Sequence, residues 1–159
     1  MGKAVSTRAS SGAQEGSDPV EAAIPAAQIA LETLEATISL RPELDDPTLG
    51  SHAAAKHARL LKRLGIPIDI PAELQDLLRA SGPKPWQHGP EAITQLRNDI
   101  THPRQDRPWT GPAMIEAWTL SLWYVELSML AWLGYRGAYN RRTRTSRWVG
   151  LVDPVPWAV

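Results

Sequence analysis

The chain of 159 residues contains no cysteine and no phenylalanine. Without cysteine there can be no disulfide, no thiolate nucleophile and no thiolate zinc site. Nothing in the composition requires an oxidising compartment, so we expect a cytoplasmic protein. The sequence also has no internal repeat and no glycine-rich phosphate loop, and no cofactor or metal is implied.

A long uninterrupted apolar run is missing as well. The most apolar stretch, residues 113–135, is interrupted by Glu116 and Glu126. Burying these carboxylates in a bilayer would cost several kcal/mol each, so we expect no membrane span. The first residues have no apolar core of the kind found in a signal peptide, and residues 1–17 are expected to form a disordered leader.

The formal net charge is zero, with 17 basic and 17 acidic residues, but the charges are unevenly spread. Acids dominate residues 15–46, whereas residues 127–152 carry arginines and no acid. Such an asymmetry can steer a polyanion or pair two copies of the chain. A solvated basic tail is an equally good explanation.

Apolar residues recur at three- and four-residue steps in five segments, which is the pattern of amphipathic helices. Asp18 and Pro19 favour a helix start, whereas Gly65 and Gly134 favour helix ends. The expected helices cover residues 18–40, 51–64, 71–82, 90–101 and 112–133.

The predicted fold class is therefore all-α: an up-and-down bundle of about five helices with an irregular, partly extended C-terminal tail. We expect residues 18–135 to form the helical domain. Residues 136–159 are expected to form a basic, tryptophan-containing tail that packs on this domain.

The fifth expected helix is apolar on two sides. Such a helix is central to a core or is shared with a partner, and we expect one stripe to face the core and the other a second chain. One stripe is Met114, Trp118, Leu122, Val125, Met129 and Trp132, and the other is Leu120, Trp123, Leu127 and Leu130.

The end of the fourth expected helix carries the most informative stretch, residues 97–102, directly before Pro103. On a continuous helix, Arg97 and His102 would lie ~140° apart around the axis and ~7.5 Å apart along it. Pro103 favours an end of the helix near Thr101. His102 can then fold back over the last turn toward Arg97 and Asn98.

These residue types suit metal-free cleavage of RNA. An imidazole such as that of His102 can act as general base or acid near neutral pH, and Arg97 can hold a phosphate through two donors. Asn98 can orient the imidazole or a phosphate oxygen. One histidine is too few for a mechanism with two proton transfers, so we expect a homodimer in which two copies of the motif face each other.

This combination resembles the HEPN superfamily, small helical domains found in ribonucleases of prokaryotic toxin–antitoxin and anti-phage systems. The family motif is Arg, usually a polar residue such as Asn, and then His after four to six intervening positions; Arg97 and His102 have four positions between them. The resemblance covers roughly residues 20–135. It implies a dimerising bundle, a composite active site and metal-independent cleavage that leaves a 2′,3′-cyclic phosphate. One family variant has a modified Tyr two residues after the His, where this chain has Arg104.

Further residues can contact RNA. The candidates are basic side chains near the motif or in the tail: His88, Arg104, Arg107, Arg141, Arg142 and Arg144. Trp109 and Trp148 can stack bases. An antitoxin or a larger defence-system partner is also expected from the resemblance.

Other interpretations of the motif remain open. Arg97 can bridge to Asp99 or Glu91 while His102 caps the helix. A metal held by Asp99 and His102 would lack further ligands in the sequence. His52 and His57 are expected at the edge of the core or in solvent. The alternative function is a non-catalytic helical RNA-binding or dimerisation module of a larger defence protein.

Overall fold

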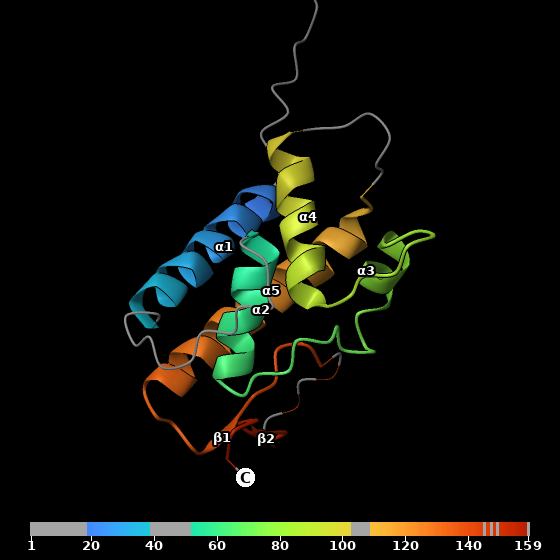
Figure 1. Ribbon diagram of the computed structural model, residues 1–159. Coiled ribbons are helices and arrows are strands. Elements are labelled where there is room, and N and C mark those ends of the chain that lie inside the picture. The colour runs from blue at the N-terminus through green and yellow to red at the C-terminus, as the bar shows by residue number, and fades with distance from the viewer. Residues whose placement is uncertain are drawn as a thin grey trace, which may run out of the picture.

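The computed structural model describes residues 19–38, 52–102, 109–144, 146, 148 and 150–158, and five helices lie in this part of the chain (Figure 1). The expected leader, residues 1–17, lies outside it. The helices are α1 Pro19–Ile38, α2 Ala53–Arg63, α3 Gln75–Ala80, α4 Gly89–Thr101 and α5 Gly111–Trp132. Strand β1, Ala138–Tyr139, pairs antiparallel with β2, Asp153–Pro154. The predicted all-α bundle with a short, partly extended tail is confirmed.

The helix ends follow local chemistry. Gly65 and Gly134 both adopt φ 69°, the left-handed conformation that stops a helix at low cost for glycine. Thr110 caps the start of α5, since its side chain accepts from the N–H of Ala113 at 3.3 Å. Pro25 lies inside α1 without ending it.

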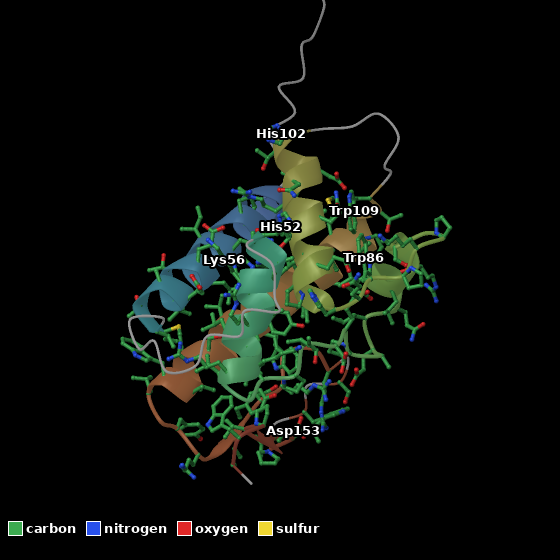
Figure 2. All side chains as sticks on the ribbon, in the orientation of Figure 1. His52, Lys56, Trp86, His102, Trp109 and Asp153 are labelled. Carbon is green, nitrogen blue, oxygen red and sulfur yellow. The ribbon has the colours of Figure 1, made fainter. Side chains whose placement is uncertain are left out.

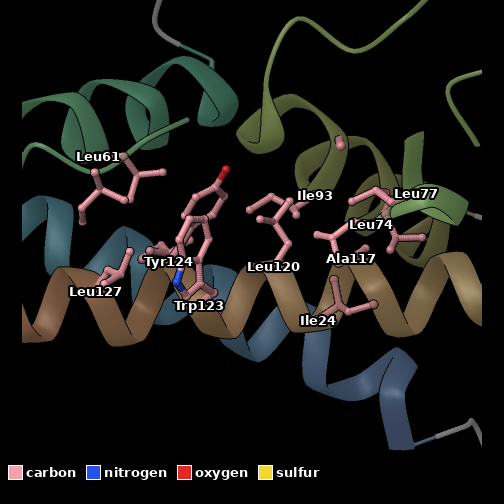
Figure 3. Packing of buried hydrophobic residues seen from close by; sticks show 14 of the residues in the cluster. Ile24, Leu61, Leu74, Leu77, Ile93, Ala117, Leu120, Trp123, Tyr124 and Leu127 are labelled. Atoms are coloured by element: carbon pink, nitrogen blue, oxygen red, sulfur yellow. The ribbon is translucent and has the colours of Figure 1, made fainter. Parts of the chain in front are cut away.

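The core lies around α5, which runs through the middle of the bundle (Figure 3). Leu120, Tyr124 and Leu127 of α5 are fully buried. They pack in the same apolar cluster as Leu61 of α2 and Ile93 of α4. Removal of apolar side chains from water is the main stabilising term here.

The two apolar stripes of α5 differ in burial. Leu120, Trp123 and Leu127 of one stripe are buried, as predicted. In the other stripe, Met129 and Trp132 near the C-terminal end are 48% and 58% exposed. This second stripe therefore leaves an apolar surface at the end of α5.

A single carbonyl oxygen connects three parts of the bundle. The oxygen of Ile68, in the connection after α2, accepts from the N–H of Gly89 at 2.7 Å and from the Tyr124 hydroxyl at 3.1 Å. Burial raises the pKa of Tyr124, so its hydroxyl stays protonated as a donor. A Cβ on residue 89 would lie 2.1 Å from the Tyr124 hydroxyl oxygen, and glycine avoids this clash.

An ion pair and a cation–π contact hold the tail against α5, and a second ion pair lies within the tail. Arg142 pairs with Glu126 of α5, with 2.8 Å between Nε and Oε1, and Arg144 pairs with Asp153 of β2. Arg141 lies over the Trp123 ring, 5.4 Å from its centroid. Cation–π contact and ion pairing thus order the residues that follow α5.

Across the described ranges, none of the helices combines the length and the apolar character needed to cross a bilayer.

Replacing Gly89 with alanine should destabilise the protein by about 1–3 kcal/mol, because the added Cβ overlaps the Tyr124 hydroxyl. Urea denaturation measures the free energy of unfolding. The cost should be smaller in a Tyr124→Phe background, where the clashing oxygen is gone. Gly111→Ala is the matched control, since Gly111 also begins a helix and a Cβ there meets nothing within 4 Å. An equal loss of stability in Gly89→Ala and Gly111→Ala would contradict the role of the contact between residue 89 and the Tyr124 hydroxyl.

Candidate functional site

The motif lies at the C-terminal end of α4. The helix ends at Thr101, and His102 leaves helical geometry at φ −129° and ψ 76°. The predicted end of the helix before Pro103 is thus present. Asn98 and His102 are exposed, whereas Arg97 is half-buried. Figure 2 shows His102 at the tip of α4, pointing away from the body of the bundle.

Short-range hydrogen bonds organise this helix end. Arg97 Nη1 donates to Asn98 Oδ1 at 3.5 Å, and the N–H of His102 donates to the carbonyl of Asn98 at 2.8 Å. The structure therefore brings Arg97 and Asn98 together. Within the described residues no hydrogen bond joins the side chains of Arg97 and His102, so the expected fold-back contact is not made in the single chain.

The motif residue Asp99 points the other way, into the domain. It is only 8% exposed, and its carboxylate accepts from Gln95 Nε2 at 3.1 Å and from Trp109 Nε1 at 3.0 Å. Asp99 thus anchors the start of the segment that leads into α5. Among the described residues no group of three or more His, Asp or Glu side chains is arranged to hold a metal.

His88 lies at the opposite end of α4 from His102. It is the N-cap residue, and its Nδ1 accepts from the N–H of Glu91 at 3.0 Å. Burial lowers the pKa of His88, partly offset by Glu91, and the accepting Nδ1 also requires this nitrogen to be unprotonated. The 13 residues of α4 span about 20 Å, so His88 and His102 do not share a site.

The candidate arginines fall into two groups. Arg104 and Arg107 lie outside the described residues. Arg141, Arg142 and Arg144 lie in the tail, whose strands β1 and β2 are at the far end of the bundle from the tip of α4 (Figure 1). Each of these three pairs with an acid, Arg141 with Glu73 at 3.6 Å. They help to order the tail, and their contact with RNA stays a prediction.

A histidine that was expected at the edge of the core or in solvent is instead buried between α1 and α2. His57 is 0% exposed, and neither ring nitrogen has a hydrogen-bond partner. A hollow of about 300 Å³ beside it is lined in part by Glu32, Glu35 and Lys56. Burial lowers the pKa of His57; Glu32 and Glu35 oppose this, and Lys56 and Arg97 add to it.

Arg97 of α4 is thus one of the charges that act on the buried imidazole of His57. The burial of His57 corrects the expectation of a solvated or core-edge histidine. Its position in one apolar stripe with Leu60, Leu61 and Leu64 was the available signal.

Together these features define a small all-helical domain with a polar, exposed helix end. Residues 10–153 match the family model of the YopA C-terminal domain, and the chain belongs to this family. It is similar to the SPbeta prophage-derived uncharacterized protein YopA of Bacillus subtilis (strain 168), with 30% identity over 143 residues. That match covers 87% of this chain and 32% of the relative, so the chain spans about a third of the relative's length. No solved structure matches the chain.

The buried imidazole predicts a loss of stability on acidification. The pKa of His57 is lower in the folded than in the unfolded protein, so below about pH 6.5 the unfolded state binds a proton that the folded state does not. The free energy of unfolding should therefore fall as the pH drops below this value. His57→Leu should flatten this dependence in urea titrations between about pH 7.5 and 5.5, a range above most carboxylate pKa values.

The matched control is His52→Leu, because His52 is exposed and precedes the same helix without a side-chain capping bond. It should keep the wild-type pH dependence. If the pH dependence of the free energy of unfolding is unchanged in His57→Leu, this imidazole is not the cause of the loss of stability on acidification.

Proposed function

We propose that this domain is a metal-independent endoribonuclease of HEPN type that acts as a homodimer on cytoplasmic RNA. The observation that carries the proposal is the end of α4, where a guanidinium, an amide and an exposed imidazole occur within one helical turn and its cap: Arg97, Asn98 and His102. The prophage origin of the relative supports a setting in toxin–antitoxin or anti-phage defence.

The chemistry needs a base, an acid and a cation. His102 takes the proton from a ribose 2′-OH, whose oxygen then forms a bond to phosphorus. The bond from phosphorus to the 5′-oxygen breaks, and an acid returns a proton to that leaving oxygen. Arg97 stabilises the added negative charge on the phosphorus centre. The products are a 2′,3′-cyclic phosphate and a free 5′-hydroxyl.

The need for a second imidazole motivates the dimer. His102 faces outward at the tip of α4, and His88 and His57 are held elsewhere in the domain. A second copy with its own His102 supplies the acid when the two helix tips meet. A symmetric dimer presents the same patch from both copies, so one surface is enough.

A second candidate is a non-catalytic interaction module of a longer protein, and it has its own supporting observation. Met129, Trp132 and Leu133 are 48%, 58% and 70% exposed at the end of α5. A hollow of about 510 Å³ beside Met129 and Leu133 is also lined by Tyr139. Large apolar side chains exposed in a group mark association surfaces. In the relative, of which the match covers 32%, the corresponding domain has further chain to contact.

RNA cleavage tests the first candidate. The purified protein should cleave single-stranded RNA in EDTA and should leave DNA intact, since DNA lacks the 2′-OH nucleophile. His102→Ala should lower the rate at least about a hundredfold, the usual contribution of a general acid or base. Arg97→Ala should also lower it. His52→Ala serves as the matched histidine control and should cleave at the wild-type rate.

Circular dichroism of His102→Ala should match the wild type, because the side chain is exposed. Full activity of this variant, or activity that requires a divalent metal, would contradict the assignment.

Association through the end of α5 is tested by Leu133→Lys, which places a charge on the most exposed residue of the apolar surface. Analytical ultracentrifugation should show the loss of any dimer formed through this surface, which lies at the other end of the bundle from the α4 tips (Figure 1). Ile29→Lys, at a 59% exposed apolar residue of α1, should leave the dimer intact. Cleavage by a monomeric Leu133→Lys variant would rule out a composite active site. RNA binding without cleavage in the wild type would favour the interaction module.

A further inference from the structure

Two tryptophans from distant parts of the sequence stack on each other and form one aromatic surface. The rings of Trp86, before α4, and Trp109, before α5, stack with centroids 5.9 Å apart and an angle of 6° between their planes. At this distance parallel rings overlap only in part, so neither indole covers the whole face of the other. Figure 2 shows both side chains on the same side of the bundle, near α3.

Hydrogen bonds fix both rings in place. Trp86 Nε1 donates to the carbonyl of Leu77 at 3.1 Å, and Trp109 Nε1 donates to Asp99 Oδ2 at 3.0 Å. Asp99 is held in turn by Gln95. The aromatic surface is therefore organised before any ligand arrives, which reduces the entropy lost on binding.

The pair lines a hollow of about 380 Å³, within the size range of small-ligand sites. Its wall includes the backbone around Pro83 and Pro85 and the side chains of Lys84, Glu91 and Gln95. The Glu91 carboxylate accepts from the N–H of Gln87 at 2.6 Å. Lys84 is exposed and forms no ion pair with the described residues, and Gln95 keeps its amide oxygen as an acceptor.

We propose that this hollow binds a purine base of single-stranded RNA, stacked on one indole of the Trp86–Trp109 pair, with Lys84 on the adjoining phosphate. This inference rests on the proposed function and names a base-binding subsite for it. Stacking on aromatic side chains is a general mode of single-strand recognition. The Gln95 oxygen can accept from the exocyclic amine of adenine or guanine.

The same helix links the subsite to the motif. Asp99 lies between Asn98 and His102 in the sequence and holds Trp109 by a hydrogen bond. A base at the tryptophan pair therefore positions its strand beside the end of α4. A proline-rich peptide suits the hollow less well, because its carbonyls need donors and both indole N–H groups are already used.

Binding is measured by fluorescence anisotropy with a short dye-labelled oligoadenylate, and His102→Ala is the background so that the probe stays intact. Trp109→Leu should weaken binding about tenfold or more, the loss expected for one stacked base. Lys84→Ala should weaken it and lower the salt slope by about one, as for one phosphate contact. Lys62→Ala, at an exposed lysine of α2 outside the hollow, should bind as tightly as the background.

The Lys84→Ala variant should fold like the background protein, since the side chain is exposed. Ultraviolet crosslinking of the bound probe should label Trp86 or Trp109. Unchanged binding in both variants, or capture of a proline-rich peptide without any oligoadenylate, would overturn the inference. If binding follows the predicted pattern but the wild-type protein cleaves no RNA, the base-binding subsite is supported and the ribonuclease activity is refuted.

Discussion

The double hydrogen bond at the Ile68 carbonyl fixes where α4 begins, and the rest of the candidate site depends on that position. Gly89 and Tyr124 donate to the same oxygen, so the connection after α2, the first residue of α4 and the middle of α5 meet at one point. The absence of a side chain on Gly89 permits this approach. Because an α-helix is stiff over 13 residues, anchoring its first residue also directs its last turn.

The two sides of α4 have different roles: one faces solvent, and the other holds the helix against the domain. Asn98 and His102 face solvent at its end, whereas Asp99, directly after Asn98, is buried and receives two hydrogen bonds. A helix places consecutive residues about 100° apart, so a short stretch can supply both an exposed polar group and its anchor. The bond from Trp109 to Asp99 ties the end of α4 to the segment that enters α5. The helix end that carries the proposed chemistry is therefore held in place by hydrogen bonds to the rest of the domain.

Local rules predicted the fold well and the environments of polar residues poorly. Apolar spacing and stop residues such as Gly65 and Gly134 are properties of neighbouring residues, and the five helices follow them. The burial of His57 and the pairing of Arg142 with Glu126 depend on contacts between elements, which spacing does not reveal. For the motif, Pro103 predicted the end of α4. The side chain that Arg97 contacts could not be predicted from residue spacing alone.

The ion pairs of the tail change how the charge asymmetry is understood. Arg141, Arg142 and Arg144 made the tail look like a surface for a polyanion, yet each lies beside a carboxylate in the folded chain. A phosphate that binds there must compete with these acids. Lys84 makes no ion pair with the described residues, and Arg97 uses its guanidinium on the amide of Asn98 and on no acid among them. Both lie on or next to α4, so the phosphate contacts of the proposed RNA site would be made at that helix, beside the imidazole of His102.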